Sequence, residues 1–258
     1  MEFVKTYIHE RIGYISLNRA EKRNALNFQF TSELKEAFKS FSENTAVKII
    51  VLKAEGPAFC AGADLEYLQQ LQHNTYKENL IDSTHLMELY KLIYTLNKVV
   101  IAEVNGHALA GGCGLVTVCD FAFSIPEANF GYTESRIGFI PAIVMNFLVK
   151  KIGETHARMM LLSGNVIKAS EAQKFGIINA IYESEEELEE EVMKFAQHLI
   201  AHNSETSMML TKQMLSEIHS MPLDEALRYA AEMNATARSS EDCKKGIAAF
   251  LNKETVKW

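Results

Sequence analysis

Residues 105–114, which read Asn-Gly-His-Ala-Leu-Ala-Gly-Gly-Cys-Gly, say more about the fold than any other stretch of this 258-residue chain. They directly follow Val99–Val104, an almost continuous apolar run of the kind that forms a strand buried on both faces. The Asn105-Gly106 pair is typical of a turn. The glycines after it open a second apolar stretch that reaches Cys119. The pattern predicts a buried strand, a tight loop and the start of a helix, in that order.

An earlier part of the chain has the same organisation. Residues 48–53 form an apolar run, Gly56-Pro57 interrupts it, and residues 59–64 read Phe-Cys-Ala-Gly-Ala-Asp. Further strands are expected at 14–17 and 121–124, and helices after a capping Asn27 and over residues 75–97. Because strand and helix patterns alternate, we expect an α/β core with crossover connections.

The second half of the chain is different, because the pattern after about Thr155 is mostly helical. One apolar face is formed by Leu188, Val192, Phe195 and Leu199, and a second by Leu223, Leu227, Ala230 and Ala231. We therefore predict two regions, an α/β core over residues 1–195 and a helical region over residues 196–258. The second region is too small to hold a core of its own, so it must pack on the first or on another subunit.

The composition excludes several partners. With 26 Lys and Arg against 33 Asp and Glu, the net charge is −7, whereas nucleic acids and anionic membranes require a basic face. No run approaches the ~20 apolar residues of a membrane span, and the first residues are already strand-like, so no targeting segment is expected. The four cysteines show no CxxC pairing, which favours free thiols and a cytoplasmic protein.

A metal site is not expected. His198 and His202 are one helical turn apart, a spacing that could hold a metal ion. However, the stretch lacks the glutamate of a HExxH site and offers no third ligand.

Three segments carry the chemistry. Residues 60–64 and 105–114 both follow a buried strand, and their small side chains leave backbone N–H groups unobstructed. If both loops faced one point, their N–H groups could bind a single carbonyl oxygen as an oxyanion hole. In the third segment, residues 128–141, Glu134 stands among apolar residues. Burial would raise its pKa toward a value useful for proton transfer.

Taken together, these segments resemble the enoyl-CoA hydratase/isomerase (crotonase) superfamily over nearly the whole chain. The matching motifs, in family order, are 17–19 (Leu-Asn-Arg), 24–27 (Asn-Ala-Leu-Asn), 59–64, 105–113, 119–120 (Cys-Asp), 130–134 (Phe-Gly-Tyr-Thr-Glu), 138–141 (Gly-Phe-Ile-Pro) and 246–250 (Gly-Ile-Ala-Ala-Phe). The resemblance implies a ClpP/crotonase-like spiral of ββα units followed by a helical trimerisation region. It also implies a homotrimer or a hexamer built from two trimers.

The resemblance assigns site residues by position. The N–H groups of Ala63 and Gly111 would bind the oxygen of a CoA thioester, and Glu134 would be the acid/base. Further contacts to the acyl-CoA would come from Ala61, Gly62, Ala63 and Asp64 at its bend, from Lys22 or Arg23 at its phosphates, and from Phe250 and Lys253 of a neighbouring subunit at its adenosine end. Coenzyme A is then part of the substrate, and no separate cofactor is expected.

One position departs from the family pattern. Hydratases of this family typically carry a second glutamate in the Gly-Gly-Cys-Glu context, where this chain has Gly114. Isomerases need one base and keep a glutamate at the position of Glu134, so Gly114 favours an isomerase. Residues 133–144 instead look like the bacterial methylglutaconyl-CoA hydratases of leucine breakdown, which commonly carry Gly-Gly-x-Gly in the oxyanion segment.

We therefore favour a lyase that hydrates a 2-enoyl-CoA to a 3-hydroxyacyl-CoA, with 3-methylglutaconyl-CoA as a candidate substrate in leucine degradation. A 3,2-enoyl-CoA isomerase or another single-glutamate crotonase is the alternative. A non-catalytic CoA-binding or assembly protein is a third hypothesis, which the presence of Glu134 and both loops disfavours. The sequence leaves open which group replaces the glutamate absent at Gly114.

Overall fold

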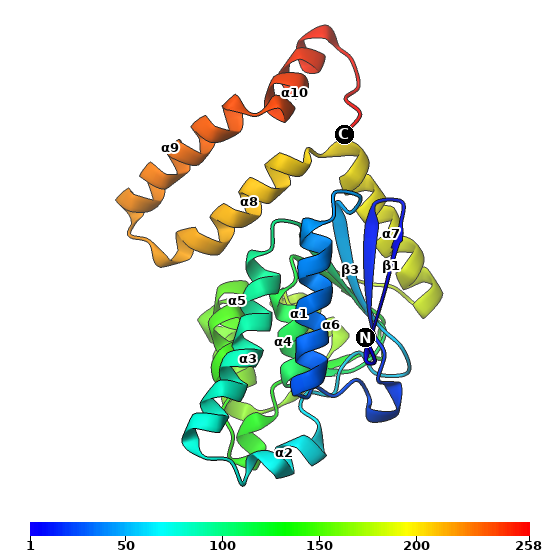
Figure 1. Cartoon of the computed structure of the whole chain (residues 1–258), viewed down its shortest axis with the longest axis vertical. Coiled ribbons are helices and arrows are strands. Elements are labelled where there is room, and N and C mark those ends of the chain that lie inside the picture. The colour runs from blue at the N-terminus through cyan, green and yellow to red at the C-terminus, as the bar shows by residue number, and fades with distance from the viewer.

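The computed structural model describes all of residues 1–258 and is built around a twisted six-stranded sheet (Figure 1). Its strands, in spatial order, are β1 (Val4–His9), β2 (Ile12–Leu17), β3 (Ile49–Ala54), β4 (Val99–Val104), β6 (Phe121–Ser124) and β9 (Ala180–Ile181). The hairpin β1–β2 is antiparallel and every later pair is parallel. All residues of β2 and β4 are buried, because parallel strands in an α/β protein are covered on both faces.

A second sheet of three short strands lies beside the glycine-rich loop. It consists of β5 (Ala108–Leu109), β7 (Asn129–Gly131) and β8 (Val166–Lys168), with β7 in the middle. The N–H of Ala110 donates to the carbonyl oxygen of Gly131 at 2.7 Å. This sheet therefore joins the loop after β4 to the segment that precedes Glu134.

Helices cover both faces of the large sheet. On one face, α1 (Phe28–Glu43) packs on the β1–β2 hairpin and on α3 (Tyr76–Thr95), and on the other α7 (Glu185–His202) packs on β3, β4 and β6. The side chain of Asn27 caps α1 by accepting from the N–H of Phe30 at 2.8 Å, as the sequence predicts. The remaining helices of the core are α2 (Leu65–Leu71), α4 (Gly111–Val118), α5 (Ala142–Ser163, kinked at Gly153) and α6 (Ala169–Phe175), with the short 3₁₀ turns Ala20–Lys22 and Glu134–Ile137.

The C-terminal helices form an arm that extends from the core and folds back on itself (Figure 1). They are α8 (Glu205–Glu217), α9 (Leu223–Ser239) and α10 (Glu241–Asn252), with a 3₁₀ turn at Ile218–Ser220 between the first two. Neither α9 nor α10 has a buried residue, and Leu223 and Phe250 are 73% and 82% exposed. Residue 195, where the sequence places a boundary, lies inside α7, whose apolar face (Leu188, Val192, Ala196, Leu199) is buried against the sheet.

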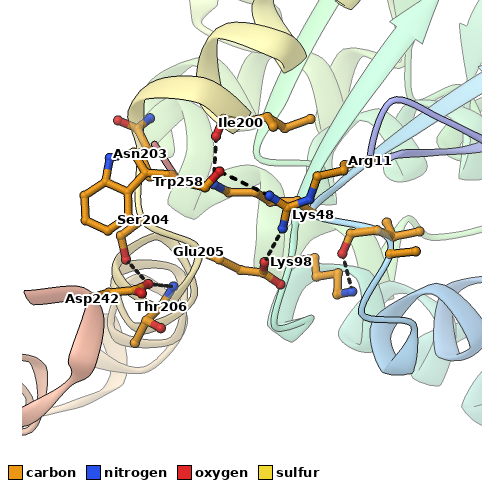
Figure 2. A network of polar contacts seen from close by, with 12 residues as sticks. Arg11, Lys48, Lys98, Ile200, Asn203, Ser204, Glu205, Thr206, Asp242 and Trp258 are labelled. Carbon is orange, nitrogen blue, oxygen red and sulfur yellow. Dashed lines mark hydrogen bonds and ion pairs between the residues drawn. The ribbon is translucent and has the colours of Figure 1, made fainter. Parts of the chain in front are cut away.

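A polar network fixes the base of this arm to the core (Figure 2). Lys48 donates to the carbonyl oxygens of Ile200 and Asn203 at 2.8 and 2.7 Å, which satisfies the C-terminal end of α7. Asp242 at the start of α10 accepts from the hydroxyl of Ser204 at 2.6 Å and from the N–H of Thr206 at 3.3 Å. Three helix ends therefore meet at one place.

Candidate active site

The two small-residue loops lie side by side, as the oxyanion hypothesis requires. The N–H of Cys60 donates to the carbonyl oxygen of His107 at 3.1 Å, and the N–H of Leu109 donates to the carbonyl oxygen of Cys60 at 2.9 Å. These two bonds form a short parallel bridge between Cys60 and Ala108. The loop after β3 is thus held against the loop after β4 through backbone atoms alone.

Glycine is required where these loops touch. A Cβ added to Gly112 would stand 2.2 Å from the carbonyl oxygen of Cys60, far inside any real contact. Gly62 has φ +95°, and a Cβ added there would stand 2.9 Å from the Cβ of Ala110. Both glycines therefore permit a close approach of the two backbones that no other residue allows.

The approach leaves two N–H groups, those of Ala63 and Gly111, without a hydrogen-bond acceptor. Leu26 pairs with Ala63 by donating to the oxygen of Gly62 at 2.7 Å and accepting from the N–H of Asp64 at 2.9 Å, so the N–H of Ala63 takes no part. Gly111 is the first residue of α4, and its N–H has no acceptor inside the helix. The positive end of the helix dipole lies at the same point.

The residue before Gly111 has an unusual backbone. Ala110 caps α4 with φ 47° and ψ −122°, a conformation that L-residues rarely adopt. Strain of this kind costs on the order of 1–3 kcal/mol and concentrates at functional sites. It is held here by the bond from the N–H of Ala110 to Gly131.

Glu134 begins a 3₁₀ turn three residues after the end of β7 and is half-buried. Its Oε2 is buried and has no hydrogen-bond partner, and burial raises the pKa of this carboxyl above its ordinary value. Arg136, the nearby cation that could neutralise it, donates instead to Asn165 at 3.4 Å. The carboxylate is therefore free to accept a proton.

The charge of Glu134 acts on two residues at the glycine-rich loop, Tyr90 and Cys113. Burial is the main reason why the pKa values of Tyr90 and Cys113 are raised, and the charge of Glu134 raises both further. Tyr90 lies against Gly111, since its hydroxyl donates to the carbonyl oxygen of Gly111 at 2.8 Å, and Cys113 is two residues further along α4. The backbone also links Glu134 to this loop, since Gly131, three residues before Glu134, accepts a hydrogen bond from the N–H of Ala110, the residue before Gly111.

Asp64 lies in this loop, but its side chain is already engaged. It forms an ion pair with Arg19 at 2.6 Å and caps α2 by accepting from the N–H groups of Glu66 and Tyr67. Although burial opposes it, the hydrogen bond from Arg19 and those two N–H groups hold the pKa of Asp64 below its ordinary value. Its side chain therefore shapes the loop, while Ala61 and Gly62 keep only backbone and methyl groups at its surface.

The residues predicted to meet the rest of a CoA molecule fall into two groups. Lys22 and Arg23 lie at the edge of the loop, where the N–H of Ala61 donates to the carbonyl oxygen of Arg23 at 3.0 Å. Lys22 is exposed and pairs with Glu66 at 2.6 Å. Phe250 lies in α10 and Lys253 caps its C-terminal end, at the opposite end of the molecule from α2 (Figure 1), so one chain does not bring them to this site.

Sequence reasoning did not place Tyr90 at the site, which it reaches from the C-terminal half of α3. Its ring belongs to the fully buried core, and its hydroxyl contacts the glycine loop. The helical spacing of α3 predicts an inward-facing residue there, but no local pattern indicates which loop that residue meets.

The remaining candidates for special chemistry are inert or absent. Cys60, Cys113 and Cys119 are buried free thiols whose pKa burial raises to about 12. No three His, Cys, Asp or Glu side chains are grouped to hold a metal ion. None of the helices combines the length and apolar composition needed to cross a bilayer.

Comparison with known structures defines the class of protein. An enoyl-CoA hydratase from Shewanella pealeana has the same fold at a TM-score of 0.93 and 28% sequence identity, covering 99% of this chain and 96% of that one. The structure is therefore an α/β crotonase fold with helical C-terminal additions, as the sequence predicts.

The family follows from the sequence comparison. The family model for enoyl-CoA hydratase/isomerase matches residues 7–258, and the chain belongs to that family. A Thermus thermophilus protein named provisionally as an enoyl-CoA hydratase is 38% identical over 94% of this chain and 95% of its own length. The crotonyl-CoA hydratase of Syntrophomonas wolfei is 31% identical over 95% of this chain and 93% of its own length. Neither of these two relatives carries the methylglutaconyl-CoA name that residues 133–144 suggest.

Proposed function

We propose that this protein adds water across the 2,3 double bond of a 2-enoyl-CoA thioester and releases a 3-hydroxyacyl-CoA. The observation that supports the proposal is a half-buried carboxylate, Glu134, whose buried Oε2 has no partner, three residues after the strand residue that bonds to Ala110 beside Gly111. The N–H groups of Ala63 and Gly111 have no acceptor. Hydration needs a group that moves protons and donors that stabilise the enolate, and these residues can supply both.

In the proposed reaction the thioester oxygen accepts hydrogen bonds from Ala63 and Gly111. As the oxygen of water bonds to C3, the electrons of the double bond move onto the thioester oxygen, where those N–H groups and the dipole of α4 stabilise the charge. Glu134 takes the proton that the water loses and then gives a proton to C2. One carboxylate thus performs both transfers, and its raised pKa suits it to accept and to release a proton.

Two candidate substrates differ in their acyl group. The motif over residues 133–144 supports branched 3-methylglutaconyl-CoA, and with it a place in leucine degradation. The relative named crotonyl-CoA hydratase supports a short unbranched 2-enoyl-CoA. Comparing kcat/KM for the two compounds decides between them.

The test of the reaction is Glu134→Gln, which keeps the size of the side chain and removes the base. Hydration is followed by loss of the absorbance of the conjugated thioester with 3-methylglutaconyl-CoA and crotonyl-CoA. We expect a fall of about 10²–10⁴-fold in kcat, the usual contribution of a positioned acid/base. A variant that hydrates both substrates at the wild-type rate would refute the assignment.

Isomerisation of a 3-enoyl-CoA is the second candidate, and Gly114 is the observation that favours it. Moving a proton from C2 to C4 requires one base, which Glu134 could supply alone. Incubation of a 3-enoyl-CoA with the protein separates the two reactions. If the protein hydrates a 2-enoyl-CoA in a parallel incubation but forms neither 2-enoyl-CoA nor hydrated product from the 3-enoyl-CoA, the isomerase candidate is wrong.

The proposal extends to the assembly and to the CoA moiety. The exposed apolar residues of α9 and α10 support a homotrimer or a hexamer, in which α10 of a neighbouring subunit brings Phe250 and Lys253 to the adenosine end of CoA. Lys22 or Arg23 of the subunit that binds the thioester would contact the phosphates of the same CoA molecule. Light scattering measures the oligomer, and Lys253→Glu is expected to raise KM without lowering kcat. A monomer in solution would refute this arrangement.

A further inference from the structure

Gly114 is enclosed by side chains that leave no room for a larger residue. A Cβ added there would stand 2.5 Å from Cγ1 of Val144 and 3.1 Å from both the Cζ and the Oη of Tyr90. Val144 is 4% exposed and Tyr90 is fully buried, so neither side chain can turn into solvent to make space. The place of a second carboxylate is thus filled by the ring of Tyr90 and a valine methyl group.

Tyr90 fills this space and also bonds to the loop. Its hydroxyl donates to the carbonyl oxygen of Gly111 at 2.8 Å, and it would stand 3.0 Å from a Cβ added to Gly111. On α3 its neighbours Leu89 and Ile93 are also fully buried, and all three belong to the hydrophobic core. Burial raises the pKa of Tyr90 well above its ordinary value, so the hydroxyl remains a neutral donor.

We propose that Tyr90 occupies the position of the second acid/base found in two-glutamate hydratases and acts as a positioning residue that holds Gly111. This inference rests on the proposed function, because it concerns the same pocket. It explains how the site tolerates Gly114: the glycine makes room for the tyrosine, and the tyrosine fixes the residue whose N–H faces the substrate. Glu134 is left as the single carboxylate.

The first test is Tyr90→Phe, which keeps the ring and removes the donor. The interaction with Gly111 matters when charge develops on the thioester oxygen, so we expect kcat to fall about tenfold and KM to change less than about twofold. The matched control is Tyr94→Phe, one turn further along α3 and packed on Phe147. It should leave both parameters unchanged. Equal kcat for Tyr90→Phe and wild type would overturn the positioning role, even if the melting temperature fell.

The second test is a double-mutant cycle between Gly114→Glu and Tyr90→Ala. Gly114→Glu alone should lower the melting temperature, because the glutamate displaces Val144 and Tyr90. The melting temperature of the double variant should fall by much less than the sum of the two single falls, because removal of the tyrosine ring leaves space for the glutamate side chain. Additive losses would show that the two residues do not share this space and would overturn the inference.

The two tests also separate this inference from the proposed function. The double-mutant cycle is read from the melting temperature and needs no substrate. If the wild-type protein hydrates no enoyl-CoA but the cycle is strongly non-additive, the proposed function fails and the shared space of Tyr90 and Gly114 stands. If hydration is observed and the cycle is additive, the proposed function stands and the shared space of Tyr90 and Gly114 is refuted.

Discussion

A methyl group added to Gly112 tests whether the contact between the two loops aligns the N–H groups of Ala63 and Gly111. The new Cβ would stand 2.2 Å from the carbonyl oxygen of Cys60, whereas ordinary contact begins at 3.4 Å. The obstructing atom belongs to the backbone, so the loops themselves must separate by about 1 Å. A misplacement of that size can cost about 10²-fold in rate. We therefore expect Gly112→Ala to lower kcat/KM for enoyl-CoA hydration about 100-fold.

The assay combines steady-state hydration of crotonyl-CoA with thermal unfolding followed by circular dichroism. Overpacking of this kind typically costs about 1–3 kcal/mol of stability, so a control must lose stability away from the site. Gly176→Ala serves, because Gly176 has φ +85° at the end of α6 with open space around its Cα. The left-handed conformation should cost about 1–2 kcal/mol and leave kcat/KM unchanged. If Gly112→Ala folds and keeps kcat/KM within about threefold of wild type, the alignment argument is wrong.

Three further predictions concern charged groups. Because burial raises the pKa of Glu134, kcat/KM should fall as the pH drops through that pKa. At a pH above that pKa, where ionisation of the carboxyl costs stability, Glu134→Gln should raise the melting temperature, and at a pH below it the variant should bring no gain. A pH series of rates and melting curves checks both expectations. Asp64→Ala leaves the buried Arg19 without its carboxylate partner and should lower the free energy of unfolding, measured with denaturant, by about 3–5 kcal/mol. Asp64→Asn keeps the cap on α2 and should lower it by less. Hydrogen bonds from Ser204 and Thr206 lower the pKa of Asp242, so stability should be lost as the pH falls through that lowered pKa; Asp242→Asn should flatten this part of the pH–stability curve, and an unchanged curve would contradict the prediction.

The long buried elements could be predicted from the sequence because their signals are local. Residues 48–53 and 99–104 are apolar runs that the structure forms as β3 and β4, shifted by at most one residue. The helical spacing over residues 75–97 corresponds to α3, and a capping asparagine marks the start of α1. In each case burial of the element's own side chains determines the structure, so the pattern is visible within the segment itself.

The short strands could not be predicted in the same way. The three strands of the small sheet have two or three residues each, too few for any periodic pattern. They exist because the chain after β4 and the chain before Glu134 pair with each other, as in the bond from Ala110 to Gly131. Tyr90 escaped prediction for the same reason, since it is separated in sequence from the glycines that it contacts.

A glycine in place of an expected carboxylate has two structural explanations, which sequence alone cannot separate. Either the side chain is lost and leaves a space where water could substitute for it, or another residue fills the space. Around Gly114 the second explanation holds, because even a single added carbon would collide with Val144 and Tyr90. A water molecule needs at least as much room as that carbon and two or more polar partners. At this point it would meet a valine methyl group, the tyrosine ring and one polar atom, the Tyr90 hydroxyl, which already donates to Gly111. In the proposed reaction, whether hydration or isomerisation, the protons are therefore expected to pass through Glu134.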